Sequence, residues 1–210
     1  SYSLPIVEGT ESERALDIAG WSNESKRDVE VFRNSVSDNN HHGILFRLGV
    51  TNSRIEENES FANAHVGEAW ATGIYLSGSP GNVIECNRVH HNQDSGIEVQ
   101  TGSNDNIVRQ NMSWSNGDHG FAQLYATGTV LIGNVAYNNA REGFSVEGDA
   151  TGTRIYNCVA YNPGVTVDTY CLLVDSSSPA GFSADELKWG IIAREEQELR
   201  NMNLGKGNRL

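Results

Sequence analysis

Residues 82–100, NVIECNRVHHNQDSGIEVQ, and residues 106–121, NIVRQNMSWSNGDHGF, follow one pattern that recurs after 24 residues. In each stretch an Asn is followed five residues later by a second Asn, and four residues after that by a Gly. The full pattern occurs at Asn34, Asn39 and Gly43, at Asn87, Asn92 and Gly96, at Asn111, Asn116 and Gly120, and at Asn134, Asn139 and Gly143. A fixed period of this length is typical of solenoid proteins.

One copy of the pattern carries an insertion. Asn58 and Asn63 are followed by Gly73, six residues later than in the other copies, which places extra residues within AHVGEAWAT, residues 64–72. The first Asn recurs at intervals of 24, 29, 24 and 23 residues, so the insertion accounts for the long interval. After Asn134 the pattern decays, and Cys158 takes the place of the next Asn.

Three short segments of each repeat have apolar residues at alternate positions, as in GIEV and GIYL after the Gly. Period-2 runs broken by polar turns indicate strands. We therefore predict an all-β parallel β-helix, a three-sheet solenoid of about seven coils, with the first Asn of each repeat stacked as a buried ladder. Asn111 in NMS and Asn58 in NES would then be ladder residues rather than glycan acceptors, whereas Asn23 lies outside the ladder.

The ends of the chain depart from the repeat. We expect residues 1–14 to form a lead-in, residues 15–178 the β-helix, and residues 179–210 a C-terminal helical cap or tail. Ser183 and Glu186 have the spacing of a capping box, and apolar residues then recur at helical spacing. This predicts a helix over 184–202.

Composition limits the partners. The formal net charge is −12, which argues against nucleic acid and favours cations such as calcium. No apolar run is long enough to span a membrane. No signal peptide is visible, but the N-terminus is typical of a trimmed, mature chain. The three cysteines leave one unpaired, so a full disulfide framework is not expected.

The two quoted repeats resemble those of right-handed parallel β-helix proteins of the pectate-lyase-like superfamily, which includes polysaccharide lyases and alginate C5-epimerases. The resemblance covers roughly residues 15–175. It implies a right-handed coil, a secreted, extracellular or periplasmic location, and an acidic (uronate) polysaccharide as substrate. It also implies a substrate groove along the first sheet, which is the sheet that follows each Gly.

Residues that point outward on this sheet, or that directly precede each Gly, are the candidate site residues. A lyase or epimerase must neutralise the sugar carboxylate, remove the C5 proton and supply a proton. We expect His119 as the base, Tyr75 as the acid, and Arg141 and Asp118 as further catalytic residues. Candidate substrate-binding residues are Arg47, Glu98, Gln100, Glu142 and Glu147.

Calcium is an alternative to arginine as the neutralising charge, and its candidate ligands are Asp94, Glu98 and Asp118. A structural interpretation competes with these roles, because Asp before Gly is an ordinary turn residue and acidic rows can be solvated surface. We expect His41, His42, His90 and His91 to be surface residues. The chain departs from the family in lacking a central lysine base, since its lysines are Lys26, Lys188 and Lys206. A non-catalytic module that binds glycan or protein, or a scaffold, is therefore the alternative to an enzyme.

A second row lies three residues after each ladder position and includes Trp114, Tyr137 and Tyr161. Alternation places these side chains outward on the third sheet. An exposed apolar row usually marks a contact. We expect the C-terminal segment or a second copy of the chain to cover it, with sugar stacking as the alternative.

Overall fold

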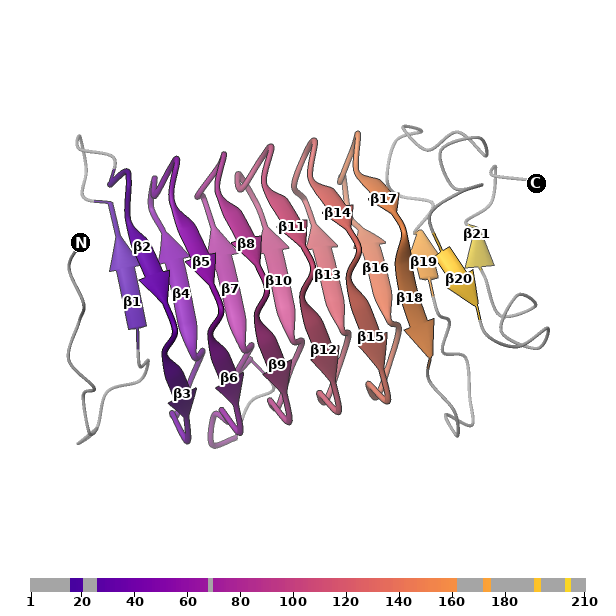
Figure 1. Ribbon diagram of the computed structural model, residues 1–210, viewed down its shortest axis with the longest axis horizontal. Helices are drawn as coiled ribbons and strands as arrows, with labels where there is room; N and C mark the ends of the chain where they lie inside the picture. Colours follow the sequence, from indigo (N-terminus) through magenta and orange to yellow (C-terminus); the bar gives the residue numbers. More distant parts are fainter. Residues whose placement is uncertain are drawn as a thin grey trace.

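The computed structural model describes residues 16–20, 26–67, 70–161, 172–174, 191–193 and 203–204. In these parts of the chain the regular structure is entirely strand, and the strands stack coil on coil into an elongated rod (Figure 1). Three sheets run along the rod, and every strand pairing within them is parallel. The structure therefore confirms the predicted three-sheet parallel β-helix.

The strands follow the repeat in strict rotation through the three sheets. The first sheet contains β1 (Leu16–Ala19), β4 (Ile44–Arg47), β7 (Ile74–Ser77), β10 (Ile97–Gln100), β13 (Phe121–Leu124), β16 (Phe144–Glu147), β19 (Leu172–Val174) and β21 (Asn203–Leu204). The second contains β2 (Glu30–Phe32), β5 (Arg54–Glu56), β8 (Val83–Glu85), β11 (Ile107–Arg109), β14 (Val130–Ile132) and β17 (Arg154–Tyr156). The third contains β3 (Ser35–Ser37), β6 (Glu59–Phe61), β9 (Arg88–His90), β12 (Met112–Trp114), β15 (Val135–Tyr137), β18 (Cys158–Tyr161) and β20 (Ile191–Ala193).

These strands make six complete coils, from β1–β3 to β16–β18, and β19, β20 and β21 extend the first and third sheets beyond them. The expected number was about seven. Most of the helix predicted over 184–202 lies outside the described residues. Within that range the structure describes Ile191–Ala193, which form β20 and pair with β18 instead of belonging to a helix. Among the residues that the structure describes, no helix is long and apolar enough to cross a lipid bilayer.

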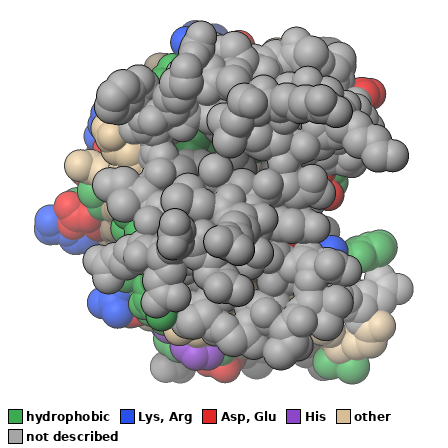
Figure 2. Space-filling model, turned by 90° about the vertical axis from the view of Figure 1, so that its right-hand side faces the viewer, with side chains coloured by type: hydrophobic (Ala, Val, Ile, Leu, Met, Phe, Trp, Pro, Cys, Tyr) green, Lys and Arg blue, Asp and Glu red, His purple; other side chains and the backbone are tan. Residues whose placement is uncertain are grey.

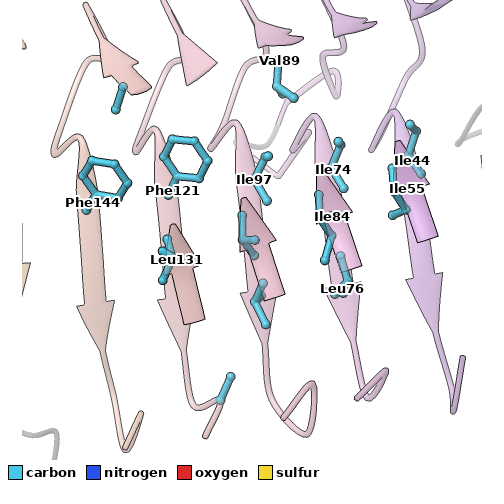
Figure 3. Packing of buried hydrophobic residues seen from close by; sticks show 14 of the residues in the cluster. Ile44, Ile55, Ile74, Leu76, Ile84, Val89, Ile97, Phe121, Leu131 and Phe144 are labelled. Atoms are coloured by element: carbon cyan, nitrogen blue, oxygen red, sulfur yellow. The ribbon is translucent and has the colours of Figure 1, made fainter. Parts of the chain in front are cut away.

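The core is built from inward rows that stack along the rod. Ile44, Ile74 and Ile97 occupy one position of the first sheet in successive coils, and Phe121 and Phe144 continue this row (Figure 3). The two phenylalanine rings stack with centroids 5.0 Å apart. Burying one such side chain stabilises the folded protein by about 2 kcal/mol. Each added coil adds a similar layer of buried apolar side chains.

The Gly of each repeat is required by close packing against the third sheet. A Cβ atom at Gly96 would lie 2.0 Å from the Ser113 hydroxyl oxygen and 2.8 Å from the Gly120 carbonyl oxygen. At Gly73 it would lie 2.2 Å from a methyl carbon of Val89. These contacts are too short for any side chain, so only glycine fits at Gly73 and Gly96.

The predicted asparagine ladder is present. The side-chain amides of Asn58, Asn87 and Asn111 each donate to the Oδ1 atom of the next ladder residue, at 3.0, 2.9 and 3.1 Å. Asn111 also donates to the Ile84 carbonyl at 2.9 Å, and its Oδ1 accepts the Asn87 backbone N–H. At the end of the ladder, the Asn134 amide contacts the sulfur of Cys158 at 3.8 Å. The second Asn of each repeat forms a parallel ladder, as in the 3.0 Å bond from Asn92 to Asn116.

The second sheet is held by ion pairs between coils. The Glu85 carboxylate is buried and contacts Arg54 of the preceding coil at 2.8 Å and Arg109 of the following coil at 2.6 Å. Two cations thus satisfy one buried anion, which avoids the cost of an unpaired buried charge. In a view along the rod from its C-terminal end, basic and acidic side chains lie next to one another on one flank (Figure 2).

Candidate functional site

The central strands of the first sheet bring Tyr75, Glu98 and Gln100 together. Tyr75 on β7 and Glu98 on β10 are direct neighbours in the parallel register. The Tyr75 hydroxyl donates a short hydrogen bond to Oε1 of Gln100, and Nε2 of Gln100 donates to Glu98 at 3.2 Å. The other carboxylate oxygen of Glu98 accepts from the Thr72 hydroxyl at 3.1 Å. A continuous hydrogen-bonded chain therefore runs from the phenol to a carboxylate.

The environment of this chain raises the pKa of several groups. Burial, reinforced by the nearby charge of Asp94, raises the pKa of Glu98 to about 7. Burial, followed by repulsion from Asp118, raises the pKa of Asp94 to about 6, and a hydrogen bond between the two carboxyl groups acts in the same direction. Burial and the charge of Glu98 raise the pKa of Tyr75 to about 12. These carboxyl groups are therefore poised to exchange a proton near neutral pH.

His119 lies one coil further along and is surrounded by carboxylates. Its Nδ1 is 2.8 Å from Glu142, and its Nε2 is 3.2 Å from Glu147 and 3.5 Å from Asp118. Burial lowers the pKa of the imidazole, but the hydrogen bonds to Glu142 and Glu147 and the charge of Asp118 outweigh it and raise the pKa to about 10. His119 is thus a cation at neutral pH, whereas the sequence suggested a base.

The partners of His119 divide into a buried and a surface group. Glu142 is only 5% exposed and lies beside the imidazole, and its predicted role in substrate binding stays a prediction. Glu147 is half-buried, and its hydrogen bond to His119 lowers its pKa. Arg141 is exposed and contacts Asp118 at 3.1 Å. Of the two predicted cations on this sheet, Arg141 is therefore part of the cluster.

Arg47, the other predicted cation, is not in this cluster. Its guanidinium makes two bonds with Asp17 on β1, at 2.8 and 2.9 Å. The strand β7 separates β4, which carries Arg47, from β10, which carries Glu98. Arg47 therefore belongs to the N-terminal end of the sheet.

Two contributors to the site were not recognised from the sequence. His42 was expected at the surface but is 7% exposed, stacks on the Tyr75 ring at 4.3 Å and lies 3.2 Å from the Thr72 backbone nitrogen. Thr72 was not singled out, although its hydroxyl binds Glu98. Both occupy the position directly before the Gly, and so do Ser95, His119 and Glu142, which are also buried. This position lies in a turn and carries different residue types from coil to coil, so nothing in the sequence indicated its burial.

A preformed metal centre is not evident. Within the described ranges, no group of three or more His, Cys, Asp or Glu side chains is arranged to hold a metal ion. Asp94 and Asp118 are close enough to repel each other, and Asp94 and Glu98 are partly protonated near neutral pH because of their raised pKa values. Calcium would have to compete with those protons to bind here.

The aromatic row on the third sheet is a stack of rings. His90 and Trp114 stack at 4.2 Å, Trp114 and Tyr137 at 5.5 Å, and Phe61 and His90 at 5.1 Å. Arg88 lies 5.6 Å from the Trp114 ring centroid. Because the ring faces contact one another, they are not available for a flat sugar ring. Self-association through Trp114, Tyr137 and Tyr161 stays a prediction.

Comparison with known proteins places this fold in a family. The family model described as the right handed beta helix region matches residues 53–185, which include the whole cluster around Glu98 and His119. The chain belongs to this right-handed β-helix family. The match also establishes the handedness that the resemblance implied.

Proteins that are similar to this chain in sequence or structure include epimerases of alginate. The mannuronan C5-epimerase AlgE3 of Azotobacter vinelandii is 27% identical over 121 residues, which is 56% of this chain and 6% of that protein. The crystal structure of a double mutant of the periplasmic alginate epimerase AlgG is 28% identical, with a TM-score of 0.61 over 65% of this chain and 31% of that one. A second AlgG structure, 22% identical with a TM-score of 0.61, covers 70% of this chain and 36% of its own and supports the fold alone. This β-helix chain thus spans about a third of AlgG and a small part of AlgE3.

Proposed function

We propose that this β-helix protein acts on an acidic, uronate-containing polysaccharide at the first-sheet face, as a lyase or a C5-epimerase. The observation that carries the proposal is a buried cation, His119, beside carboxyl groups whose pKa values are raised to about 6 and 7. The likeness to AlgE3 and AlgG supports a uronate polymer as the substrate class.

Both reactions begin by removing the C5 proton next to the sugar carboxylate. The imidazolium of His119, with Arg141 beside it, would neutralise that carboxylate and stabilise the negative charge that develops on it. Glu98 in its ionised form would accept the C5 proton, because its pKa of about 7 matches proton transfer near neutral pH. This assignment moves the base from His119 to Glu98.

The two reactions diverge once the C5 proton has been removed. In elimination, the electron pair of the C5–H bond forms a C4–C5 double bond, the C4–O bond breaks, and the leaving oxygen takes a proton. In epimerisation, a proton returns to C5 from the opposite face. Tyr75 is the proposed proton donor in either case, since its hydroxyl is protonated at neutral pH and is hydrogen-bonded through Gln100 to Glu98.

Two further parts of the proposal concern the location of the protein in the cell and the binding of calcium. AlgG is described as periplasmic, and we propose an extracellular or periplasmic location for this chain as well. We also propose that calcium can bind at Asp94, Glu98 and Asp118 when these groups are ionised, as an additional charge for the substrate carboxylate.

The test is incubation of the protein with alginate, polymannuronate and pectate, with and without calcium. Elimination is followed by the ultraviolet absorbance of the unsaturated uronate, and epimerisation by proton NMR of the polymer. We expect one of these signals, and we expect it to be lost in Glu98→Gln and in His119→Ala. Glu30→Gln, an exposed glutamate on the second sheet, is the matched control and should retain it.

A protein that changes none of these polymers, but binds one of them, would instead be a non-catalytic glycan-binding module. That alternative is favoured by one observation, the mutual pairing of His119, Arg141, Asp118 and Glu147. Isothermal titration with the same polymers separates the two outcomes.

A further inference from the structure

The insertion in the second copy of the pattern lies beside the candidate site, and the structure describes its residues 64–67 and 70–72. It connects β6 to β7, and its first part is anchored to neighbouring coils. Oε1 of Gln93 accepts from the His65 backbone N–H at 2.6 Å, and Nε2 of Gln93 donates to the His65 carbonyl at 3.0 Å. The Ala64 N–H donates to the Asn39 carbonyl at 2.9 Å. The segment is therefore held by coils on both sides.

The last part of the insertion leads directly into the site. The Trp70 carbonyl accepts from the Thr72 N–H at 3.2 Å, and the Thr72 hydroxyl in turn donates to Glu98. The Ala71 carbonyl accepts the N–H of Asp94 at 3.2 Å. The chain directly after Trp70 is thus tied to Asp94 through the Ala71 carbonyl and to Glu98 through the Thr72 hydroxyl.

The Trp70 side chain is 60% exposed, although it is a large apolar group. Many aromatic rings of the described chain stack on one another, as on the third sheet, or lie in the core, as Phe121 and Phe144 do; Phe32 and Tyr125 are also exposed, at 44% and 51%, but less than Trp70. Within the described residues Trp70 makes no such ring contact. An indole left in water forgoes the stabilisation that burial would give, so its exposure beside a polar site indicates a binding surface.

The position of Trp70 fits a sugar ring next to the reactive one. Successive coils lie about 4.8 Å apart along the rod axis. Along this axis, the coil that follows Trp70 is one coil from that of Glu98 and two coils, about 10 Å, from that of His119. We propose that Trp70 is an aromatic platform that stacks on the pyranose ring of a uronate polymer, adjacent to the sugar held between Glu98 and His119. This proposal rests on the proposed function. It also specifies the direction of the bound polymer, which would run along the rod axis and cross the coil of β7.

The experiment compares Trp70→Ala and Trp70→Phe with Val66→Ala, which removes an 87% exposed apolar side chain from the same insertion. Binding of polymannuronate and alginate is measured by isothermal titration, and kcat and KM are measured where turnover occurs. We expect Trp70→Ala to weaken binding and raise KM about fivefold, the factor that corresponds to an aromatic contact of about 1 kcal/mol. Trp70→Phe should retain most of the affinity, Val66→Ala should match the wild type, and kcat should change little.

A second readout is the tryptophan fluorescence of the protein, which should shift when polymer is added to the wild type and shift less in Trp70→Phe. Thermal unfolding should be unchanged in all three variants, because neither exposed side chain contributes to the core. If the wild type binds the polymer and Trp70→Ala binds it equally well, the platform is wrong while the proposed function stands. If the wild type neither binds nor alters any uronate polymer, the proposed function fails and the platform fails with it.

Discussion

At the scale of single residues, the candidate site contains a carboxyl group whose pKa is raised by burial and by a neighbouring charge. Glu98 has an ordinary pKa of 4.5, and in the folded protein its pKa is about 7. A carboxyl group whose pKa rises on folding contributes stability that is fully present below 4.5 and is lost as the pH rises through 7. The ionised form of Glu98 therefore destabilises the fold at the pH at which it would act as a base.

Replacing Glu98 with Gln should remove this pH-dependent loss of stability. Below pH 4.5 the variant and the wild type should have similar free energies of unfolding, since both side chains are then neutral. Above pH 7 the variant should be more stable by about 3 kcal/mol, because the pKa rises from 4.5 to about 7 and one pKa unit corresponds to about 1.4 kcal/mol. Urea unfolding across this range measures the difference. Equal stability above pH 7 would contradict the raised pKa, and Glu30→Gln is the control in which no such difference is expected.

The same pKa values define a pH profile for any activity. The base is ionised only above about 7, and the cation of His119 is lost only above about 10. We expect kcat/KM to rise through about 7 and to fall through about 10. An alkaline limb near 6.5, the ordinary pKa of histidine, would instead show that the carboxylates around His119 do not hold its proton.

At the scale of elements, the repeat predicts the strands and the ladder residues, but it predicts only some of the turn residues. The ladder residues Asn87 and Asn111 were identifiable because one residue type recurs at one place in each coil. In the turn between the first and second sheets, side chains of three successive coils accept a backbone N–H of the preceding coil. These residues are Ser53, Asn82 and Asn106, whereas the equivalent Thr129 and Thr153 have hydroxyls that are buried without a hydrogen-bond partner. No single residue type recurs there, so the sequence does not reveal it.

Burial next to the glycines was also beyond prediction from the sequence. His42 and Glu142 directly precede a strand, and alternation does not extend into a turn, so it cannot say which way these side chains point. Alternation did place Tyr75 and Glu98 in one row, and the structure pairs them as neighbours, because both lie inside strands with period 2; Leu45, Ala122 and Ser145 of the same row are buried. The site was thus predictable where its residues belong to strands.

The ladder makes a specific prediction for Asn111. The Asn111 amide is buried and forms hydrogen bonds with Asn87, Asn134 and the Ile84 carbonyl. Asn111→Ala leaves several buried polar groups without partners, each costing about 1–3 kcal/mol, so we expect a loss of about 4 kcal/mol in the free energy of unfolding. Asn40→Ala removes an exposed asparagine and should cost less than about 0.5 kcal/mol. A loss of similar size in both variants would contradict the ladder.

At the scale of the whole molecule, the solenoid gathers residues that are far apart in sequence. Tyr75 and Glu147 belong to strands three coils apart, and the constant register of the sheet brings both to one face. The same molecule carries a formal net charge of −12, so it repels an anionic polymer overall, while the polymer would meet on this face the cations His119 and Arg141, which are paired with carboxylates.

This conflict predicts the effect of salt. The Debye length is about 30 Å at about 0.01 M ionic strength and about 8 Å at about 0.15 M, so salt screens the long-range repulsion more than the short contacts. With polymannuronate, kcat/KM should therefore rise over this range of NaCl concentration. A methyl-esterified uronate polymer carries no charge and should show no change. A fall in kcat/KM for the charged polymer would show that local attraction outweighs the net charge.

Calcium at matched ionic strength separates screening from a specific site. If Asp94, Glu98 and Asp118 bind the ion, calcium must displace the protons that the first two carry at pKa values of about 6 and 7. The additional effect of calcium over NaCl should then be small below pH 6 and should grow as the pH rises through 7. It should disappear in Asp94→Asn, a residue that is not assigned to proton transfer. An additional effect that is independent of pH, or that persists in Asp94→Asn, would place any calcium elsewhere on the protein or on the polymer itself.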